Sequence, residues 1–526
     1  MVSRSRNEVL VGIPDIAGIA NVTTSAVGNW RKRHESFPTP RVQTPTGVLF
    51  DLREVERWLI ENGKITREVP SSAVLWGLVD TFRNQWQPNQ ITRFLVALLV
   101  YLEVCDRSKA DDGPRVREAD LWDTVQGETE SELLPTLRAS GMRIEQDNES
   151  LAGLISDGLS ASPEPEGHLV ARVLHALGAV PPAETPRYEL FEELVSRVRR
   201  ADRFTGEDST PSDVTQLLVR LARARSGVVL DPAMGEGGVL LMTAIGDERD
   251  DSKSMRLVGY EINQGVAALA RARFFLYGLD VEVHLGDIFR VDAQAMPRAD
   301  LVVLDSPMAQ KRWGDAEVYL DSRWTYGPPP PGNADFAWLQ IAANAVAPGG
   351  VGLVVLPVDS LFKGGREGEI RSRMVEAGVV EAVIELPPRL RPETSVSIAI
   401  WVLRSAQDAR PGSDVLLVDA STLGESGRSR YSLPEEAIDR LAALVHGWKH
   451  EHRIAKQDFA IAVSVPTHRL MEAGFSLQAR RFLAPSEVDA AALRGESTDL
   501  RRRVGESAAE LKHEIEDLLR ALERRT

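Results

Sequence analysis

The chain has 526 residues, which is too long for one domain and fits about three or four on the usual scale of roughly 100 to 200 residues each. Hydrophobic residues make up 43% and charged residues 26%, as in soluble globular proteins, and no apolar run reaches the ~18 residues of a membrane span. The net charge of −15 argues mildly against nucleic-acid binding, because phosphate binding requires clustered Lys and Arg. It is not decisive, since basic residues still cluster locally.

The cysteine content limits the chemistry further. Cys105 is the single cysteine of the sequence, which excludes an intramolecular disulfide and a multi-cysteine zinc site, and we expect no metal. Its apolar surroundings predict a buried, structural thiol. The N-terminus has no apolar secretion segment behind its charges, so we expect a cytoplasmic protein without a membrane segment.

Residues 1–68 have the pattern of two helices joined by a turn, followed by a hairpin. Thr23 or Thr24 can cap the second helix, and Val27 would pack inward on Ile16 and Ala20. The outward set is polar and basic, which suits a DNA groove: Ser25, Asn29, Arg31, Lys32 and Arg33. Residues 41–42 and 48–50 flank a Thr-Pro-Thr-Gly turn, and the whole segment resembles the winged helix-turn-helix of excisionase and MerR-type proteins. A helical module that contacts protein remains the alternative.

Residues 70–200 have a helical pattern and contain no catalytic constellation. The run 91–104 is apolar nearly all round, which predicts a buried helix. Residues 163–167 and 181–186 are predicted loops because they are rich in proline.

Residues 201–410 alternate between strand and helix patterns, which is typical of an α/β domain with a parallel sheet and crossover helices. We predict seven strands: 228–230, 257–260, 281–285, 301–304, 351–356, 380–385 and 398–403. Functional residues of such sheets follow the carboxyl ends of the strands.

A glycine-rich loop follows the first of these strands and begins a helix. It contains Asp231, Pro232, Ala233, Gly235, Gly237 and Gly238. Glycines let the backbone approach a ligand closely, and the helix N-terminus faces that ligand. Acids follow the next two strands, as Glu261-Ile262 and Asp287-Ile288. Because an acid at the second strand suits ribose hydroxyls, and because acids around the loop suit a cation better than a phosphate, we expect S-adenosylmethionine.

Together these segments resemble the adenine-N6 DNA methyltransferase family, and specifically the methylation subunit of type I restriction-modification systems. The resemblance covers about residues 71–483 and rests on motifs in the family's order: Thr210-Pro211, the loop 231–238, Trp324-Thr-Tyr-Gly-Pro-Pro, Ala334-Asp-Phe-Ala-Trp-Leu, Ala347-Pro-Gly-Gly, Leu356-Pro and Val383-Ile-Glu-Leu-Pro. It implies a Rossmann-like class I S-adenosylmethionine-dependent methyltransferase fold. It also implies that Thr210, Pro211 and the loop bind the cofactor, with Glu261 on its ribose and Asp287 on its adenine amino group.

Residues 305–308 then correspond to the family's active-site motif, which is Asn or Asp, Pro, Pro and an aromatic residue. The chain has Asp305, Ser306, Pro307 and Met308 there, and we expect these four to be catalytic. Asp305 and the main-chain carbonyl of Ser306 can accept the amino hydrogens of adenine, whereas Ser306 should loosen the loop and Met308 should stack less well than a ring. Trp313, Trp324 or Tyr326 could replace the ring, or they could anchor their own loop.

Residues 411–526 end in a helix whose apolar positions, from Val504 to Leu522, form a heptad seam. The seam could pair with a specificity subunit or a second copy in a homodimer, or could fold back on its own domain. Two functions remain open: a DNA adenine-N6 methyltransferase of restriction-modification or phage-defence type that acts on double-stranded DNA, or a weak or inactive DNA-binding regulator with the same fold. A third possibility, methylation of a protein or a small molecule, would not explain the module of residues 1–68 or the helical segment of residues 70–200.

Overall fold

The computed structural model describes residues 10–13, 16–17, 20, 22–34, 36–44, 47–64, 86–129, 131–160, 173–174, 177, 182, 185–201, 210–223, 226–246, 255–308, 310–319, 321–391, 395–427 and 430–483. By contacts the chain divides into unit 1, Met1–Ser209 with Ser226–Val291, and unit 2, Thr210–Arg225 with Asp292–Thr526. No helix in the described ranges is long and apolar enough to cross a membrane. The predicted heptad helix of residues 504–522 and the predicted loop 163–167 lie outside these ranges.

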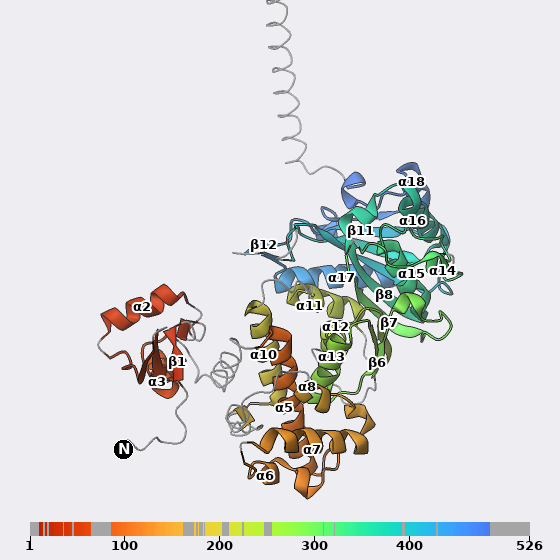
Figure 1. Ribbon diagram of the computed structural model, residues 1–526. Helices are drawn as coiled ribbons and strands as arrows, with labels where there is room; N and C mark the ends of the chain where they lie inside the picture. Colours follow the sequence, from red (N-terminus) through yellow and green to blue (C-terminus); the bar gives the residue numbers. More distant parts are fainter. Residues whose placement is uncertain are drawn as a thin grey trace, which may run out of the picture. The chain divides into compact units, whose positions relative to one another are not determined.

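The described part of the N-terminal module contains a small antiparallel sheet and the helices α2 and α3. The sheet has the order β1-β3-β2, built from β1 (Leu10–Gly12), β2 (Val42–Thr44) and β3 (Gly47–Asp51), and the helices are α2 (Thr24–Arg33) and α3 (Leu52–Glu61) (Figure 1). Thr23 is the N-cap of α2, and its hydroxyl accepts a hydrogen bond from the Ala26 amide at 3.2 Å. Val27 is fully buried together with Ile16, as the spacing predicted.

The middle of unit 1 is a helical cluster around α5 (Pro88–Lys109). Most of α5 is buried, which confirms the prediction from its apolar run. Helices α10 (Arg187–Ala201) and α13 (Gln264–Leu276) pack beside it (Figure 1). Shorter elements complete the cluster: η1 (Glu118–Asp120), α6 (Trp122–Val125), α7 (Leu133–Asp147), η2 (Glu149–Leu151) and α8 (Ser156–Ser160). Because α13 also belongs to the strand-helix alternation, one hydrophobic core joins the helical segment to the first part of the sheet.

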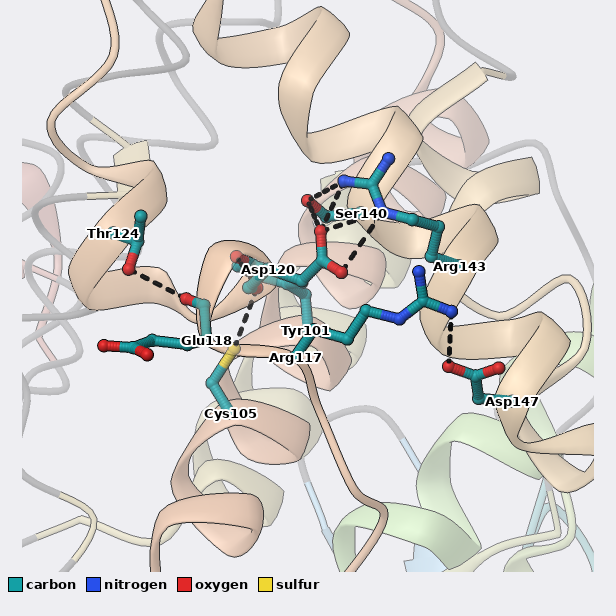
Figure 2. A network of polar contacts seen from close by, with 9 residues as sticks. All are labelled: Tyr101, Cys105, Arg117, Glu118, Asp120, Thr124, Ser140, Arg143 and Asp147. Atoms are coloured by element: carbon teal, nitrogen blue, oxygen red, sulfur yellow. Dashed lines mark hydrogen bonds and ion pairs between the residues drawn. The ribbon is translucent and has the colours of Figure 1, made fainter.

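A buried carboxylate ties three of these elements together (Figure 2). Asp120 of η1 is 1% exposed; it accepts a hydrogen bond from Ser140 at 2.8 Å and pairs with Arg143, both on α7. Its main-chain carbonyl accepts the Tyr101 hydroxyl of α5 at 2.8 Å. The Cys105 thiol lies 3.9 Å from the same carbonyl, and burial raises its pKa to about 11. Cys105 is therefore a protonated, structural thiol, as predicted.

The strands of unit 1 that belong to the large sheet have the order β4-β5-β6, and those of unit 2 have the order β14-β11-β9-β10-β8-β7. Unit 1 contributes β4 (Gly227–Asp231), β5 (Met255–Glu261) and β6 (Glu282–Leu285), which run parallel. Unit 2 contributes the other six: β7 (Ala299–Asp305), β8 (Val346–Pro357), β9 (Val380–Glu385), β10 (Ile398–Arg404), β11 (Val415–Asp419) and β14 (Ala462–Val465). All seven predicted strands are present.

One of the seven predicted strands, β10, departs from the parallel pattern, and so does β14, which was not predicted. β10 runs antiparallel to both β8 and β9, and β14 runs antiparallel to β11. The described part of residues 386–397, which joins β9 to β10, contains no helix. Since a parallel neighbour needs a long crossover, a connection of this length favours the antiparallel arrangement. Strands β11 and β14, which extend the sheet beyond residue 410, were not predicted from the sequence.

Several helices of unit 2 pack on its strands or on one another. α11 (Ser212–Ala222) packs on α17 (Glu435–Glu451), and α15 (Asp335–Ala345) packs on β7 and β8 (Figure 1). The remaining short elements of the two units are α12 (Gly238–Ile245), η3 (Ile288–Arg290), α14 (Ala316–Tyr319), η4 (Val358–Leu361), α16 (Gly365–Ala377), β12 (Glu425–Ser426), β13 (Tyr431–Ser432), η5 (Lys456–Asp458), α18 (Thr467–Glu472) and η6 (Ala479–Arg481).

Candidate functional site

The glycine-rich loop leaves β4 in a conformation that its glycines make possible. Gly235 and Gly237 have φ angles of 54° and 77°, in the left-handed region that side chains disfavour. Gly237 is the N-cap of α12, and a Cβ there would lie 2.6 Å from the ring of Phe274. By contrast, a Cβ on Gly235 or Gly238 would meet no atom within 4 Å. The loop is therefore packed on one side and open on the other, as a ligand-binding loop requires.

Asp231 is the internal brace of this loop. It is 3% exposed, and its Oδ1 accepts a hydrogen bond from the Ala233 amide at 3.0 Å. On the β5 side, the Met234 amide donates to the Tyr260 carbonyl at 2.9 Å. Asp231 therefore stabilises the conformation of the loop through its own side chain.

Arg273 of α13 holds the loop through a side-chain hydrogen bond, and no sequence pattern predicted this contact. Its Nη1 donates to the main-chain carbonyl of Glu236 at 2.7 Å, and its Nη2 donates to Glu192 of α10 at 2.9 Å. The Arg273 side chain is only 7% exposed. The position of the loop therefore depends on two helices of unit 1, a dependence that only a long-range contact reveals.

The two predicted acids follow β5 and β6. Glu261 accepts a hydrogen bond from the Asn263 amide at 2.7 Å through Oε1. Asp287 caps η3 by accepting from the Phe289 amide at 3.0 Å. Ile262 is 68% exposed, so it offers an apolar surface beside Glu261, whereas the Ile288 side chain is buried and packs inside the protein. Within unit 1 the residues predicted to hold the cofactor thus lie at consecutive carboxyl ends of β4, β5 and β6.

Asp305 ends β7 in unit 2, and both of its carboxylate oxygens have partners. Oδ2 accepts the Thr210 hydroxyl at 2.6 Å, and Oδ1 accepts a hydrogen bond from Nη2 of Arg391. The side chains of Arg391 and Asp305 are 3% and 8% exposed. Thr210, which the sequence predicted near the cofactor, therefore contacts Asp305 directly. No sequence signal pointed to Arg391, because 86 positions separate it from Asp305.

Thr210 and Pro211 owe their position to the first turn of α11. Pro211 is the N-cap of α11, and Asp213 in the first turn is buried. Asp213 accepts hydrogen bonds from Arg430 at 2.9 Å and from the Leu433 amide at 2.8 Å. These contacts fix the start of α11 and, with it, the hydroxyl that reaches Asp305.

Ser306 follows Asp305 in the motif and is held by its side chain. Ser306 is 2% exposed, and its hydroxyl donates to the Val355 carbonyl of β8 at 3.0 Å. This bond restrains the residue and provides part of the stiffness that a proline would give, while a looser loop than with proline stays a prediction. Pro307 is exposed and Met308 is half-buried.

The three aromatic residues proposed as a replacement ring are packed within their own loop. Trp313, Trp324 and Tyr326 are 4%, 6% and 7% exposed. The Trp313 ring makes an edge contact with Trp324 at 5.5 Å between centroids, and the indole N–H of Trp324 donates to the Val318 carbonyl at 2.7 Å. This burial and these contacts support the alternative that the three residues anchor their own loop.

The proposed DNA-binding residues lie on one exposed helix. Ser25, Asn29, Arg31, Lys32 and Arg33 are all exposed on α2. Arg31 also lies over the Phe50 ring, 5.8 Å from its centroid. The three basic residues occupy the last turn, where positive charge is favourable for the helix itself.

Comparison with known proteins gives a consistent result. The family described as N-6 DNA Methylase matches residues 188–490. The methylase subunit of the type I restriction enzyme HindI from Haemophilus influenzae is 28% identical over 383 residues, 70% of this chain and 83% of the relative. The MjaVII methylase subunit from Methanocaldococcus jannaschii is 30% identical over 261 residues, 46% of this chain and 44% of that relative.

Solved structures share the fold. The type I restriction-modification methyltransferase subunit from Streptococcus thermophilus has a TM-score of 0.66 at 20% identity and covers 79% of this chain and 99% of its own. A modification subunit of a putative type I restriction enzyme from Vibrio vulnificus has a TM-score of 0.59 at 15% identity, covering 80% and 98%. At these identities the likeness supports the α/β methyltransferase fold alone.

Proposed function

This chain belongs to the N-6 DNA methylase family, and from that premise we propose that it methylates adenine N6 in double-stranded DNA with Asp305 as the acceptor of the amino hydrogens. S-adenosylmethionine is the methyl donor of the family. The observation that supports the proposal is Asp305 itself, a buried carboxylate at the end of β7 in the position of the family's active-site motif.

The residues of unit 1 fit this cofactor. The open side of the loop at Gly235 and Gly238 leaves room for a ligand, and no lysine or arginine lies in the loop 231–238 to select a phosphate. Glu261 would accept hydrogen bonds from the ribose hydroxyls, Ile262 would contact the adenine face, and Asp287 would accept from its amino group. When bound, the cofactor supplies an electrophilic methyl group on a positively charged sulfur.

The chemistry of the acceptor explains why a carboxylate is needed. The N6 lone pair of adenine is delocalised into the ring, so the amino group is a poor nucleophile. A carboxylate oxygen of Asp305 and the carbonyl of Ser306 would accept its two hydrogens, which localises the lone pair for attack. After transfer the nitrogen must lose a proton, and Asp305 is the acceptor placed to receive it. The target adenine must be flipped out of the duplex for this contact.

We further propose that a separate specificity subunit selects the DNA sequence, with the N-terminal module as an additional duplex contact. The relatives are named as subunits of type I restriction enzymes, which supports an assembly. The predicted heptad seam is a candidate contact for that partner or for a homodimer. The alternative of an inactive regulator is not favoured, because Asp305 and the cofactor loop are intact.

The test is expression of the chain, with the reading frames that flank its gene, in a host without adenine methylation. N6-methyladenine in host DNA is quantified by mass spectrometry of nucleosides and mapped by single-molecule sequencing. We expect one fixed sequence context to be methylated and expect Asp305→Ala to abolish it. Asp300→Ala, which changes an exposed acid on the same strand, is the matched control and should keep methylation. No N6-methyladenine from the unaltered chain would contradict the proposal.

A further inference from the structure

Arg391 is a buried cation whose position the proposed mechanism does not by itself require. It follows β9 on a segment held at several points: the Leu386 amide donates to the Ile398 carbonyl at 2.9 Å, and Leu390 is 1% exposed. Its Nη2 donates to Oδ1 of Asp305. The guanidinium is thus fixed beside the acid that the proposed reaction uses.

One donor of this guanidinium is left over. Nε of Arg391 is buried and has no hydrogen-bond partner among the described residues. In a guanidinium, the Nε–H and one Nη–H point to the same side as a planar fork. A carboxylate could accept both, but of this fork Asp305 accepts only from Nη2, and its Oδ2 is instead oriented to the Thr210 hydroxyl. A buried donor without a partner is unfavourable, so its retention suggests that a ligand supplies the acceptor.

The acceptor that fits is on the Watson-Crick edge of the target base. Adenine carries a donor, the N6 amino group, next to an acceptor, N1. Asp305 and Arg391 offer the complementary order, an acceptor next to a donor. Guanine and thymine present the reverse order at the same positions, so both would place donor against donor and acceptor against acceptor.

We propose that Arg391 is a specificity-determining residue that donates a hydrogen bond from Nε to N1 of the flipped adenine while Asp305 accepts from N6. The base would replace the hydrogen bond that Asp305 accepts from Thr210 or the one that it accepts from Arg391. Asp305 and Arg391 would reject guanine and thymine, because these bases present their donor and acceptor in the reverse order. Cytosine has the same order as adenine, so its exclusion must come from another part of the site.

A purely structural role for Arg391 makes a different prediction. If the guanidinium only neutralises Asp305, its loss lowers the rate on every substrate by the same factor. If it reads N1, the benefit of Arg391 disappears when the base lacks that nitrogen. The distinction requires substrates that differ in a single ring atom.

The experiment uses the duplex whose methylated adenine is mapped in the expression test, and it therefore rests on the proposed function. The target adenine is replaced by 1-deazaadenine, which lacks the N1 acceptor, or by 7-deazaadenine, which lacks an acceptor on the other edge. With the unaltered protein we expect 1-deazaadenine to lower kcat/KM roughly 10- to 100-fold, the usual effect of losing a hydrogen bond to a charged group. We expect 7-deazaadenine to change it less than about threefold.

Arg391→Met serves as the second arm. We expect this variant to be slower on adenine but to methylate adenine and 1-deazaadenine at nearly equal rates. The weaker pairing of 1-deazaadenine makes it easier to flip, so a loss of rate in the unaltered protein does not arise from flipping. The comparison on the unaltered protein remains informative even if Arg391→Met fails to fold.

The outcomes separate the two proposals. Equal rates of the unaltered protein on adenine and 1-deazaadenine would overturn the role of Arg391 and leave the proposed function intact. The same discrimination in Arg391→Met would also overturn it, since the effect would then belong to the base alone. No methylation of the unmodified duplex would instead contradict the proposed function.

Discussion

The largest difference between this chain and the family's active-site motif is at Met308, where the resemblance implies an aromatic residue. A thioether recovers part of the interaction of a ring with a flipped base, about 0.3 to 1.5 kcal/mol against roughly 1 to 3 kcal/mol for an aromatic. Because the Ser306 hydroxyl donates to the Val355 carbonyl, we expect the missing ring to lower the rate more than the missing proline does.

We therefore expect Met308→Phe to raise kcat/KM for methyl transfer roughly five- to thirtyfold, corresponding to about 1 to 2 kcal/mol. The measurement is the rate of transfer of a labelled methyl group to the mapped duplex. Met308→Leu, which removes the sulfur without adding a ring, should not increase the rate. An unchanged rate in Met308→Phe would mean that the base stacks elsewhere in the site.

Asp120 shows at the scale of elements how one buried acid joins η1, α5 and α7. Burial alone would raise its pKa, but the hydrogen bonds from Arg143 and Ser140 outweigh burial and hold the pKa below its ordinary value. A carboxyl whose folded pKa is depressed stabilises the fold above its unfolded pKa, near 4. That contribution is lost as the pH falls from about 4 through the folded pKa.

We expect Asp120→Asn to lower the local stability of α7 by roughly 1 to 3 kcal/mol at pH 7, and by less below about pH 4. Hydrogen exchange of residues 133–147 measures this directly. Arg117→Ala is the control, because the Arg117–Asp147 pair spans 3.2 Å between two largely exposed side chains and should contribute little. A loss of equal size in the control would assign the effect to the surface charges of α7.

Helix α2 provides a second prediction at this scale. Replacing Arg31, Lys32 and Arg33 with alanine should weaken duplex binding and reduce the slope of log affinity against log salt by up to about 3, if each residue contacts a phosphate. Fluorescence anisotropy at several salt concentrations measures both. Arg41→Ala is the matched control, because Arg41 is paired with Glu54 at 2.5 Å outside α2. Unchanged affinity in the triple variant would favour the alternative of a protein-binding module.

At the scale of the whole molecule, we expect cofactor binding to increase the stability of the folded protein. S-adenosylmethionine at about 100 times its Kd should raise the free energy of unfolding by about 2.7 kcal/mol, which a thermal shift detects. We expect Glu261→Ala to weaken binding at least about tenfold by calorimetry without lowering the melting temperature of the free protein. Glu282→Ala on the neighbouring strand, whose partner is Arg256 at 2.6 Å, should bind normally. No binding by the unaltered protein would contradict the cofactor assignment.

The sequence by itself determined the features that depend on residues close together in the chain. Strand patterns, the glycines after β4 and the acids after β5 and β6 are local features, so seven strands and the outline of the cofactor loop could be read directly. Asp305 was also predictable, since its motif is contiguous.

Only the tertiary structure decided what depends on residues far apart in the chain. The antiparallel direction of β10, the pairing of β11 with β14, the brace of Arg273 and the contact of Arg391 with Asp305 are all long-range. Such contacts leave no periodicity in the sequence, because each is fixed by packing of the whole sheet and its helices rather than by local spacing. The sequence thus located Asp305, the carboxylate that we propose to react, while the fold placed beside it the cation that we infer reads the base.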